Sequence, residues 1–570
     1  MKKYISISKT VLLAVVVLAL GSCKDTWNNH YSFKETESKY PVAKLAETLS
    51  GIQGYDKFCT ALSTTRMCDK NGTPLNMTYM DLLNEDQFLT VWAPSNSSIS
   101  EELWAQYTKR DKTAAEHKLI GEQFLENHIA RFKHSVGAGT DGRIIMLNGK
   151  GYSSKPDAIS GQSYHADDMN IRCSNGVLHC IDGHLDFLPS LYEYITTAPE
   201  YQDLIGNWFK SFTVEELDPS RSVAQGINDN GEMVYIDSVM VTSNRLIRYF
   251  GRIDSEDSIY AIVLPTPELW ESEYGKIKKS FVYGEKFLNN DSLQQFYTRF
   301  TMMTDMFFNI NPKVQRYMPD SIFSTLYSAE ENRREGKSFH IFKNPYDKTD
   351  GLFGSCVDSV VCSNGTIYFV DKWPYDNELL YLRQIKQEAE TYTSLSDFVL
   401  KQYAVQVIGD EVLDNPIQVM RVYNDKRFDW DASYYINNHL KGRYAIKLVI
   451  APNSVDSMPN YIHPRITFTT PTKVDSVLLD SNTVQKVEYR PGKFRTQTLP
   501  MYLVNDMHKL DTLLVGEVDL PYCNYDMNQA RLCITLRSGV NGSNSVKYSS
   551  EMWLDCIILD PVVEPDPIVE

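Results

Sequence analysis

The sequence predicts an α+β protein that becomes all-β toward its C-terminus, with two tandem repeats of mixed helices and strands followed by a C-terminal β-sandwich. Three observations predict this order. A ten-residue motif occurs twice, each copy is preceded by a strand that ends at proline before a helix start, and short β-rich runs without helical segments fill the chain after residue 391. With 570 residues, the chain has room for several domains.

Residues 1–22 have the pattern of an export signal. Lys2 and Lys3 precede an apolar run over 11–20, which is shorter than the roughly 20 residues needed to cross a bilayer. The Leu-Gly-Ser-Cys sequence that follows resembles the lipobox of bacterial lipoproteins. This resemblance implies cleavage before Cys23, lipidation of that residue, and anchorage in the outer membrane.

Residues 23–37 are predicted to form a polar tether behind the lipid anchor. Lys24 and Asp25 resemble part of the surface-export signal of Bacteroidetes lipoproteins, which favours the cell surface. A solvated tether explains the same two residues equally well, so the periplasmic face of the membrane stays open as an alternative.

The repeated motif lies near the end of each predicted repeat, 38–190 and 191–388. Cys-Ser-Asn-Gly-Val-Leu-His-Cys-Ile-Asp at 173–182 recurs as Cys-Ser-Asn-Gly-Thr-Ile-Tyr-Phe-Val-Asp at 362–371. In both copies we expect Asn-Gly to supply the positive φ angles of a tight turn, followed by a β-strand.

A second paired element lies upstream of each motif, at 89–96 and 260–267. Each is a β-rich run stopped by proline. Ser98 is then expected to cap a helix with Glu101 three residues later, and in the second repeat Thr266 is expected to cap a helix that starts at a proline.

Together, Thr-Val-Trp-Ala-Pro-Ser-Asn at 90–96 and Asn-Gly-Val-Leu-His-Cys-Ile-Asp at 175–182 resemble the two signature strands of the fasciclin domain. The resemblance implies two tandem fasciclin-like domains. The second copy departs from the pattern, since Pro267 stands in place of the asparagine and 211–247 has the character of an insertion.

Three histidines in the first repeat are candidate functional residues. Phe124, Leu125, Ile129 and Phe132 recur at helical spacing, which predicts a helix over 116–132 with His128 on its apolar face. The resemblance links this helix position to integrin adhesion, but a hydrogen-bonded core histidine is favoured. His179 and His184 lack further ligands at a recognised spacing, so we predict no metal site and no cofactor.

Cysteine usage favours free thiols over a disulfide scaffold. Nine cysteines besides Cys23 are spread along the chain. Cys173 and Cys180 flank the predicted turn and are expected to be buried free thiols, with a hairpin cross-link as the alternative.

The predicted C-terminal sandwich covers 389–560, and a proline-rich acidic tail follows at 561–570. Expected strands lie at 405–408, 444–450, 474–479, 513–518, 531–536 and 553–559. The last of these is similar to the closing strand of galactose-binding-like jelly rolls. Trp430, Tyr434 and Tyr435 are candidate ligand-binding aromatics, and the alternative is that they belong to the core.

Eight Asp-Ser or Asp-Thr sites resemble the O-glycosylation acceptor of Bacteroidetes envelope proteins, and we expect some of them to be used. The acceptors are Ser238, Ser258, Ser292, Ser321, Ser359, Ser457, Ser476 and Thr512.

The net charge of -16 disfavours nucleic-acid binding, and no catalytic motif is found, which predicts a protein that is not an enzyme. Tandem-fasciclin lipoproteins resemble accessory subunits of SusC/SusD-type uptake systems. The implied partners are a TonB-dependent transporter, a SusD-like lipoprotein, and a glycan or peptide ligand. The alternative function is a fasciclin-type surface adhesin or structural envelope protein.

Overall fold

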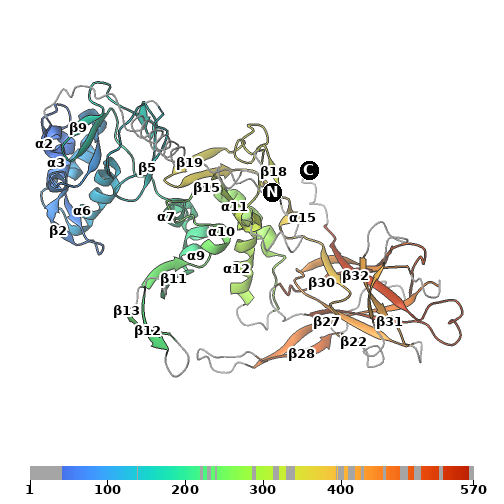
Figure 1. Cartoon of the computed structure of the whole chain (residues 1–570). Coiled ribbons are helices and arrows are strands. Elements are labelled where there is room, and N and C mark those ends of the chain that lie inside the picture. Colours follow the sequence, from blue (N-terminus) through green and yellow to red (C-terminus); the bar gives the residue numbers. More distant parts are fainter. Residues whose placement is uncertain are drawn as a thin grey trace, which may run out of the picture. The chain divides into compact units, whose positions relative to one another are not determined.

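The computed structural model (Figure 1) describes residues 42–137, 139–217, 222–227, 233–237, 240–284, 290–311, 320–328, 340–392, 394–395, 404–408, 417–424, 429–452, 458–475, 486–492, 502–525 and 531–563. The chain divides into two compact units. One comprises residues up to 194 together with 253–259 and 361–366, and the other comprises the remainder. Cys23 and the tether lie outside the described residues.

The first repeat is built on a four-stranded sheet in the order β4-β3-β10-β9. The two motif strands, β3 (Leu89–Pro94) and β10 (Gly176–Ile181), pair in parallel, and all their residues are buried. Their mostly apolar sequences, in which Thr90 and His179 are the polar exceptions, suit strands covered on both faces. The other strands are β4 (Ile129–Arg131), β9 (Ile171–Cys173), and a smaller sheet of β5 (Gly142–Ile145), β6 (Gly151–Ser154), β7 (Ala158–Ile159) and β8 (Gln162–Ser163).

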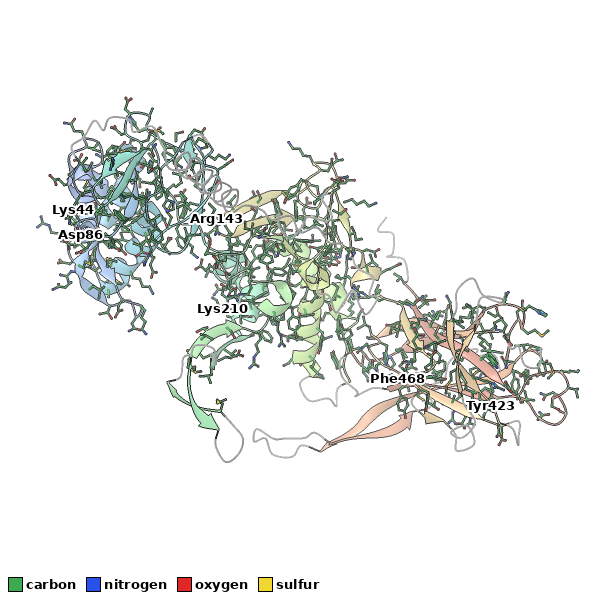
Figure 2. The ribbon with its side chains drawn as sticks, viewed as in Figure 1. Lys44, Asp86, Arg143, Lys210, Tyr423 and Phe468 are labelled. Atoms are coloured by element: carbon green, nitrogen blue, oxygen red, sulfur yellow. The ribbon has the colours of Figure 1, made fainter. Side chains whose placement is uncertain are left out.

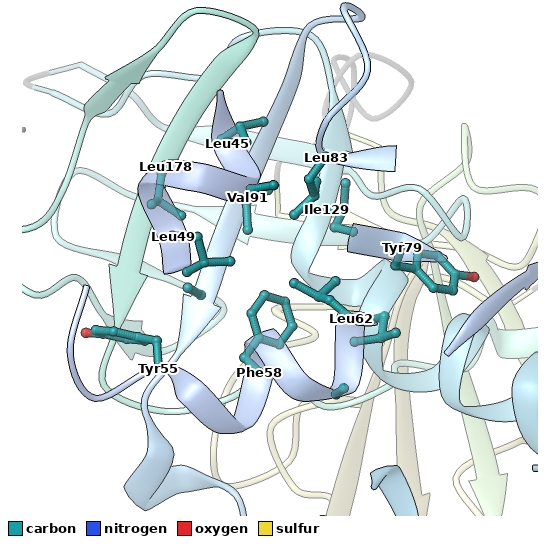
Figure 3. Close-up of a cluster of buried hydrophobic side chains, with 14 of the residues drawn as sticks. Leu45, Leu49, Tyr55, Phe58, Leu62, Tyr79, Leu83, Val91, Ile129 and Leu178 are labelled. Atoms are coloured by element: carbon teal, nitrogen blue, oxygen red, sulfur yellow. The ribbon is translucent and has the colours of Figure 1, made fainter. Parts of the chain in front are cut away.

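Short helices cover this sheet and form the core with it. Figure 3 shows Leu45 and Leu49 of α2 beside Val91 and Leu178 of the central strands, with Phe58 of α3 next to them. At the surface, the Lys44 ammonium and the Asp86 carboxylate form an ion pair of 2.8 Å (Figure 2). The helices are α2 (Leu45–Ser50), α3 (Asp56–Thr64), α4 (Tyr79–Leu82), α5 (Glu101–Tyr107) and α6 (Ala114–Ile120).

The second repeat has a sheet with the same strand order, β16-β15-β20-β19. Its strands are β15 (Tyr260–Pro265), β16 (Phe307–Asn309), β19 (Asp358–Cys362) and β20 (Gly365–Val370), and its longer helices are α11 (Pro267–Lys278) and α12 (Asn290–Met303). The helix start at Pro267 is as predicted. The expected insertion contains two antiparallel pairs, β11 (Thr213–Leu217) with β14 (Met240–Asn244) and β12 (Val223–Ile227) with β13 (Met233–Asp237).

The Asn-Gly pair of the motif has a different role from the predicted one. Neither Asn175 nor Gly176 has a positive φ, and the register of β9 and β10 places Ser174 and Asn175 at the turn. Asn175 accepts a hydrogen bond from the Leu45 backbone N–H (2.8 Å) and donates to two carbonyls, those of Leu83 and Glu85. Gly176 is required because a Cβ there would lie 2.0 Å from the Leu89 carbonyl oxygen.

Asn364 repeats this arrangement in the second copy of the motif. It accepts from the Leu191 backbone N–H (2.8 Å) and donates to the carbonyls of Ile253 and Ser255. Residues 253–259 and 361–366, which Asn364 joins in this way, are part of the first unit. The same segments carry Glu256, whose carboxylate pairs with Arg143.

The predicted helix over 116–132 is too long. α6 ends at Ile120, and π-helical and 3₁₀ turns carry the chain to His128 before β4 begins at Ile129. Phe132 is 73% exposed with a φ of 70° and is not on a buried helical face. The predicted cap at Ser98 is also wrong, because the Ser100 hydroxyl accepts from the Leu103 backbone N–H at the start of α5.

The C-terminal part contains strands and no helix among its described residues from Ile385 onward, and these strands form two sheets. The first has the order β23-β24-β32-β26-β30, with β21 also paired to β32, and the second has the order β22-β25-β31-β27-β28, with β29 paired to β27. The strands are β21 (Ile385–Glu388), β22 (Ser394–Leu395), β23 (Ala404–Ile408), β24 (Ile417–Val422), β25 (Asp431–Ile436), β26 (Gly442–Ile450), β27 (Tyr461–Asp475), β28 (Lys486–Gly492), β29 (Leu503–Val504), β30 (Asp511–Leu520), β31 (Arg531–Ser538) and β32 (Met552–Pro561).

This architecture is the predicted β-sandwich. Phe468, labelled in Figure 2, is one of the buried residues of this sandwich. Its two sheets contain no described strand that precedes Ile385 in the chain. Strand pairing therefore begins a few residues before the predicted boundary at 388. Among the described residues, no helix has both the length and the apolar character needed to span a membrane.

Candidate functional site

The outward face of the second sandwich sheet is the candidate site. Side chains alternate along its strands, so that Ile462, Ile466 and Phe468 of β27 are buried, while the residues between them point outward. The paired registers place the outward residues of three neighbouring strands side by side. We call this surface the outward face: Asp431, Ser433 and Tyr435 of β25, Thr535 and Arg537 of β31, Tyr461, His463, Arg465 and Thr467 of β27, and the adjoining Tyr502 and Tyr548.

Three tyrosines form a parallel stack at one end of this face. The ring centroid of Tyr461 lies 4.2 Å from that of Tyr502 and 4.6 Å from that of Tyr548, with interplanar angles of 14° and 18°. All three side chains are half-buried, so that part of each reaches solvent. Because each ring fixes its neighbour, a ligand would bind the stack without the cost of ordering it.

The chain brings the stack together from three separate segments. Tyr461 opens β27 and pairs with Val504 of β29, which places Tyr502 next to it, while a bridge between Asn460 and Ser549 brings in Tyr548. Gly539 leaves room for the rings, since a Cβ there would lie 2.6 Å from Tyr461 Cδ1 and 2.8 Å from Tyr502 Cδ1.

Hydrogen-bonding groups continue the face beyond the stack. The His463 ring is exposed and lies 5.3 Å from that of Tyr502, and the hydroxyls of Ser433 and Thr535 are 2.9 Å apart. Burial against its neighbours raises the pKa of Tyr461, and the two flanking phenols add to this effect. The Tyr461 hydroxyl therefore stays a neutral donor and acceptor at physiological pH.

Of the three predicted aromatics, only Tyr435 lies on the outward face. Trp430 is 5% exposed and donates to the Ser550 carbonyl, and Tyr434 is fully buried. The alternative of core aromatics is therefore correct for these two. Successive residues of a strand point to opposite faces, which places Tyr434 in the core and the half-buried Tyr435 outside. Neither Trp430 nor Tyr434 offers a ring to a ligand.

The predicted O-glycosylation acceptors fall into three groups. The exposed ones are Ser292, Ser359 and Thr512, and the half-buried ones are Ser258 and Ser321. Ser238, Ser457 and Ser476 lie outside the described residues.

Two of the three candidate histidines of the first repeat, His128 and His179, are buried and hydrogen-bonded within the core. His128 is fully buried, its Nδ1 lies 2.8 Å from the Phe124 carbonyl oxygen, and its Nε2 accepts from the Leu185 backbone N–H, as expected for a core histidine. His179 is also buried and accepts from the Asn170 backbone N–H. His184 instead pairs with the Asp186 carboxylate at 3.1 Å.

The cysteines of the repeated motif are free thiols. Cys173 and Cys180 are both buried and unbridged, so the favoured prediction is confirmed and the hairpin cross-link is not formed. Burial raises the pKa of the Cys173 thiol, which keeps it protonated and unreactive.

One buried cluster in the second repeat combines a hydroxyl, a carboxylate and an imidazole. Asp305 accepts hydrogen bonds from Ser324 Oγ (2.8 Å) and from His340 Nδ1, while the Asp376 backbone N–H donates to His340 Nε2 (2.8 Å). Both imidazole nitrogens are therefore engaged away from the hydroxyl. The cluster joins distant segments and does not activate Ser324 as a nucleophile.

Two cavities lie elsewhere in the described residues. One of about 550 Å³ is bordered by polar groups that include Lys155, Asp157 and the His184–Asp186 pair. Another of about 540 Å³ is bordered by the half-buried rings of Trp208 and Phe296, which are inclined by 48°. The first has no phenylalanine, tyrosine or tryptophan in its lining, and the two rings of the second are inclined to each other, so neither has the parallel rings of the tyrosine stack.

No protein-family model and no curated protein matches the chain. Among solved structures, the chain is similar to a GH26-CBM35 β-(1,4)-mannanase of Podospora anserina, with 11% identity over 32% of this chain and 29% of that chain and a TM-score of 0.17. An exo-β-1,3-galactanase of Phanerochaete chrysosporium has 12% identity, coverages of 31% and 29%, and a TM-score of 0.16.

A third similar structure is the CBM22-2 xylan-binding domain of Paenibacillus barcinonensis Xyn10C. It has 9% identity over 31% of this chain and 99% of that domain, with a TM-score of 0.18. The chain thus spans less than a third of the length of the two enzymes. TM-scores of this size assign neither a fold nor a function.

Proposed function

We propose that this chain is a non-enzymatic glycan-binding protein and that the outward face of its C-terminal sandwich holds the ligand. The observation that carries the proposal is the tyrosine stack. Sugar rings have an apolar face of C–H groups and an equatorial rim of hydroxyls. Aromatic rings bordered by hydrogen-bonding side chains suit both, because the solvent-exposed parts of the rings cover the apolar face and the polar groups fix the orientation.

The cellular setting that we propose is the outer membrane. Lipidation at Cys23 and the following tether would hold the protein at the cell surface, and two fasciclin-like repeats would separate the sandwich from the membrane. In this setting the protein is an accessory subunit of a SusC/SusD-type uptake complex. The lipobox-like sequence supports the anchor, and the common strand order of the two repeat sheets supports a duplicated domain.

Replacing Tyr502 by alanine is expected to weaken glycan binding about tenfold. The substitution removes one ring of the stack, and the remaining rings are then free to change their orientation. Affinity electrophoresis of the full chain in gels that contain xylan, mannan or polygalacturonate measures the change. Tyr502→Phe should stay within about threefold of the wild type, since it keeps the ring.

The matched control is Tyr346→Ala. Tyr346 is 60% exposed and lies in the second repeat, outside the sandwich. If Tyr346→Ala weakens binding as much as Tyr502→Ala does, or if Tyr502→Ala has no effect on a polymer that the wild type retains, the outward face is not the binding surface.

A further inference from the structure

The cations of the two sandwich sheets differ in their partners. On the first sheet, Arg421 pairs with Glu551 at 2.6 Å, Arg443 pairs with Glu517 at 2.8 Å, and Lys447 pairs with an aspartate. These cations are neutralised within the protein.

Arg465 and Arg537 on the outward face are exposed, and neither has an ion-pair partner among the described residues. Asp431 is the cross-strand neighbour of Arg537 but does not form an ion pair with it. The chain as a whole is acidic, with 73 acidic and 57 basic residues. Two guanidinium groups on one surface that have no ion-pair partner among the described residues give this surface a local positive charge.

The two arginines are close to the tyrosine stack. Arg537 is the cross-strand partner of His463, whose ring contacts Tyr502, and Arg465 lies two residues further along β27 on the same face. Directly opposed residues of paired strands have Cβ atoms about 5 Å apart, and diagonal ones about 7–8 Å. When one sugar ring of a glycan lies at the stack, the next one or two sugars of the same chain are therefore within reach of both guanidinium groups.

We propose that the outward face selects glycans that carry carboxylate groups, with uronic-acid rings lying along the tyrosine stack and their carboxylates bound by Arg465 and Arg537. The proposal rests on the glycan-binding function proposed above. A guanidinium group donates two parallel hydrogen bonds to a carboxylate, a geometry that hydroxyl groups do not match. Asp431, directly opposite Arg537, is the one acidic side chain of this face and weakens the attraction of Arg537 for a carboxylate, whereas charges beyond about 8 Å are screened at physiological ionic strength.

The test compares polygalacturonate with its fully methyl-esterified form, which has the same backbone without the charge. We expect the wild-type full chain to bind the acidic polymer about tenfold more tightly, and the Arg465→Ala/Arg537→Ala double variant to lose this preference. The double variant should lose more affinity for the acid than for the ester. Arg443→Ala, which removes one cation from the other sheet, should keep the preference.

Tyr502→Ala separates this inference from the proposed function, because it should weaken binding of both polymers equally. If the wild type binds the ester as tightly as the acid and Tyr502→Ala weakens both, the preference for carboxylates is overturned and glycan binding stands. If Tyr502→Ala changes neither, or if the wild type binds neither these polymers nor xylan or mannan, both proposals are overturned.

Discussion

Replacing Asn175 by alanine is expected to lower the free energy of unfolding of the first unit by about 3 kcal/mol. The substitution leaves the Leu45 N–H and the carbonyls of Leu83 and Glu85 without the buried amide that joins them, and each lost hydrogen bond costs about 1 kcal/mol. Asn364→Ala should have a comparable effect, since it removes the equivalent three bonds.

Urea unfolding combined with hydrogen exchange in β3 and β10 measures the loss in the unit concerned. Ser174→Ala is the matched control, because Ser174 is exposed and precedes Asn175 in the same turn. A loss of unfolding free energy in Asn175→Ala that is no larger than that in Ser174→Ala would contradict the view that this asparagine stabilises the unit by joining three segments.

The first unit is expected to lose about 4 kcal/mol of stability between pH 7 and pH 5. Burial lowers the pKa of His128 to about 3 and that of His179 to about 4, so both rings are neutral in the folded protein over this range. In the unfolded chain the same histidines take up protons as the pH falls through 6.5. The contribution of these two histidines to stability is therefore fully present above pH 6.5. It declines as the pH falls from there toward their pKa values in the folded protein.

Urea denaturation at pH 7, 6 and 5 measures this loss. His179→Gln should remove about half of the pH dependence, because each histidine contributes about 2 kcal/mol at pH 5. In the sandwich, where burial lowers the pKa of His439 to about 4, a loss of about 2 kcal/mol is expected. A stability of the first unit that is unchanged between pH 7 and pH 5 would show that these rings are protonated in the folded state.

The sequence predicts the order of the folded parts because that order depends on local patterns. The repeated motif, the strands that end at Pro94 and Pro265, and the helix start at Pro267 are each encoded within a few residues, and each lies where it was predicted. The sandwich follows in the same way from runs of β-forming residues.

The role of Asn175 could not be predicted in this way, because its partners are 90 to 130 residues away in the chain. A local pattern favours the turn conformation that Asn-Gly often adopts, whereas the fold uses the amide to join three segments and the glycine for close packing. Phe132 is a similar case. Its spacing fits a helix, but the helical turns end at His128 and β4 pairs with β3 instead.

The candidate site depends almost wholly on tertiary structure. Around Tyr461, the alternation of outward residues with Ile462 and Ile466 is visible in the sequence, but nothing local connects Tyr461 with Tyr502 and Tyr548. Trp430 and Tyr434 are candidates by residue type alone. Which face of a strand a residue occupies depends on the register of the sheet, and a shift of one residue reverses it.

Hydroxyl-radical footprinting of the full chain, with and without xylan, mannan or polygalacturonate, locates the glycan on the protein, because a bound ligand protects the tyrosines that it covers from oxidation. At least one of these polymers is expected to lower the oxidation of Tyr461, Tyr502 and Tyr548 and to leave Trp208 and Phe296 unchanged. Protection of Trp208 and Phe296 in place of the tyrosines, or protection of neither group by any of the three polymers, would contradict the proposed binding at the outward face.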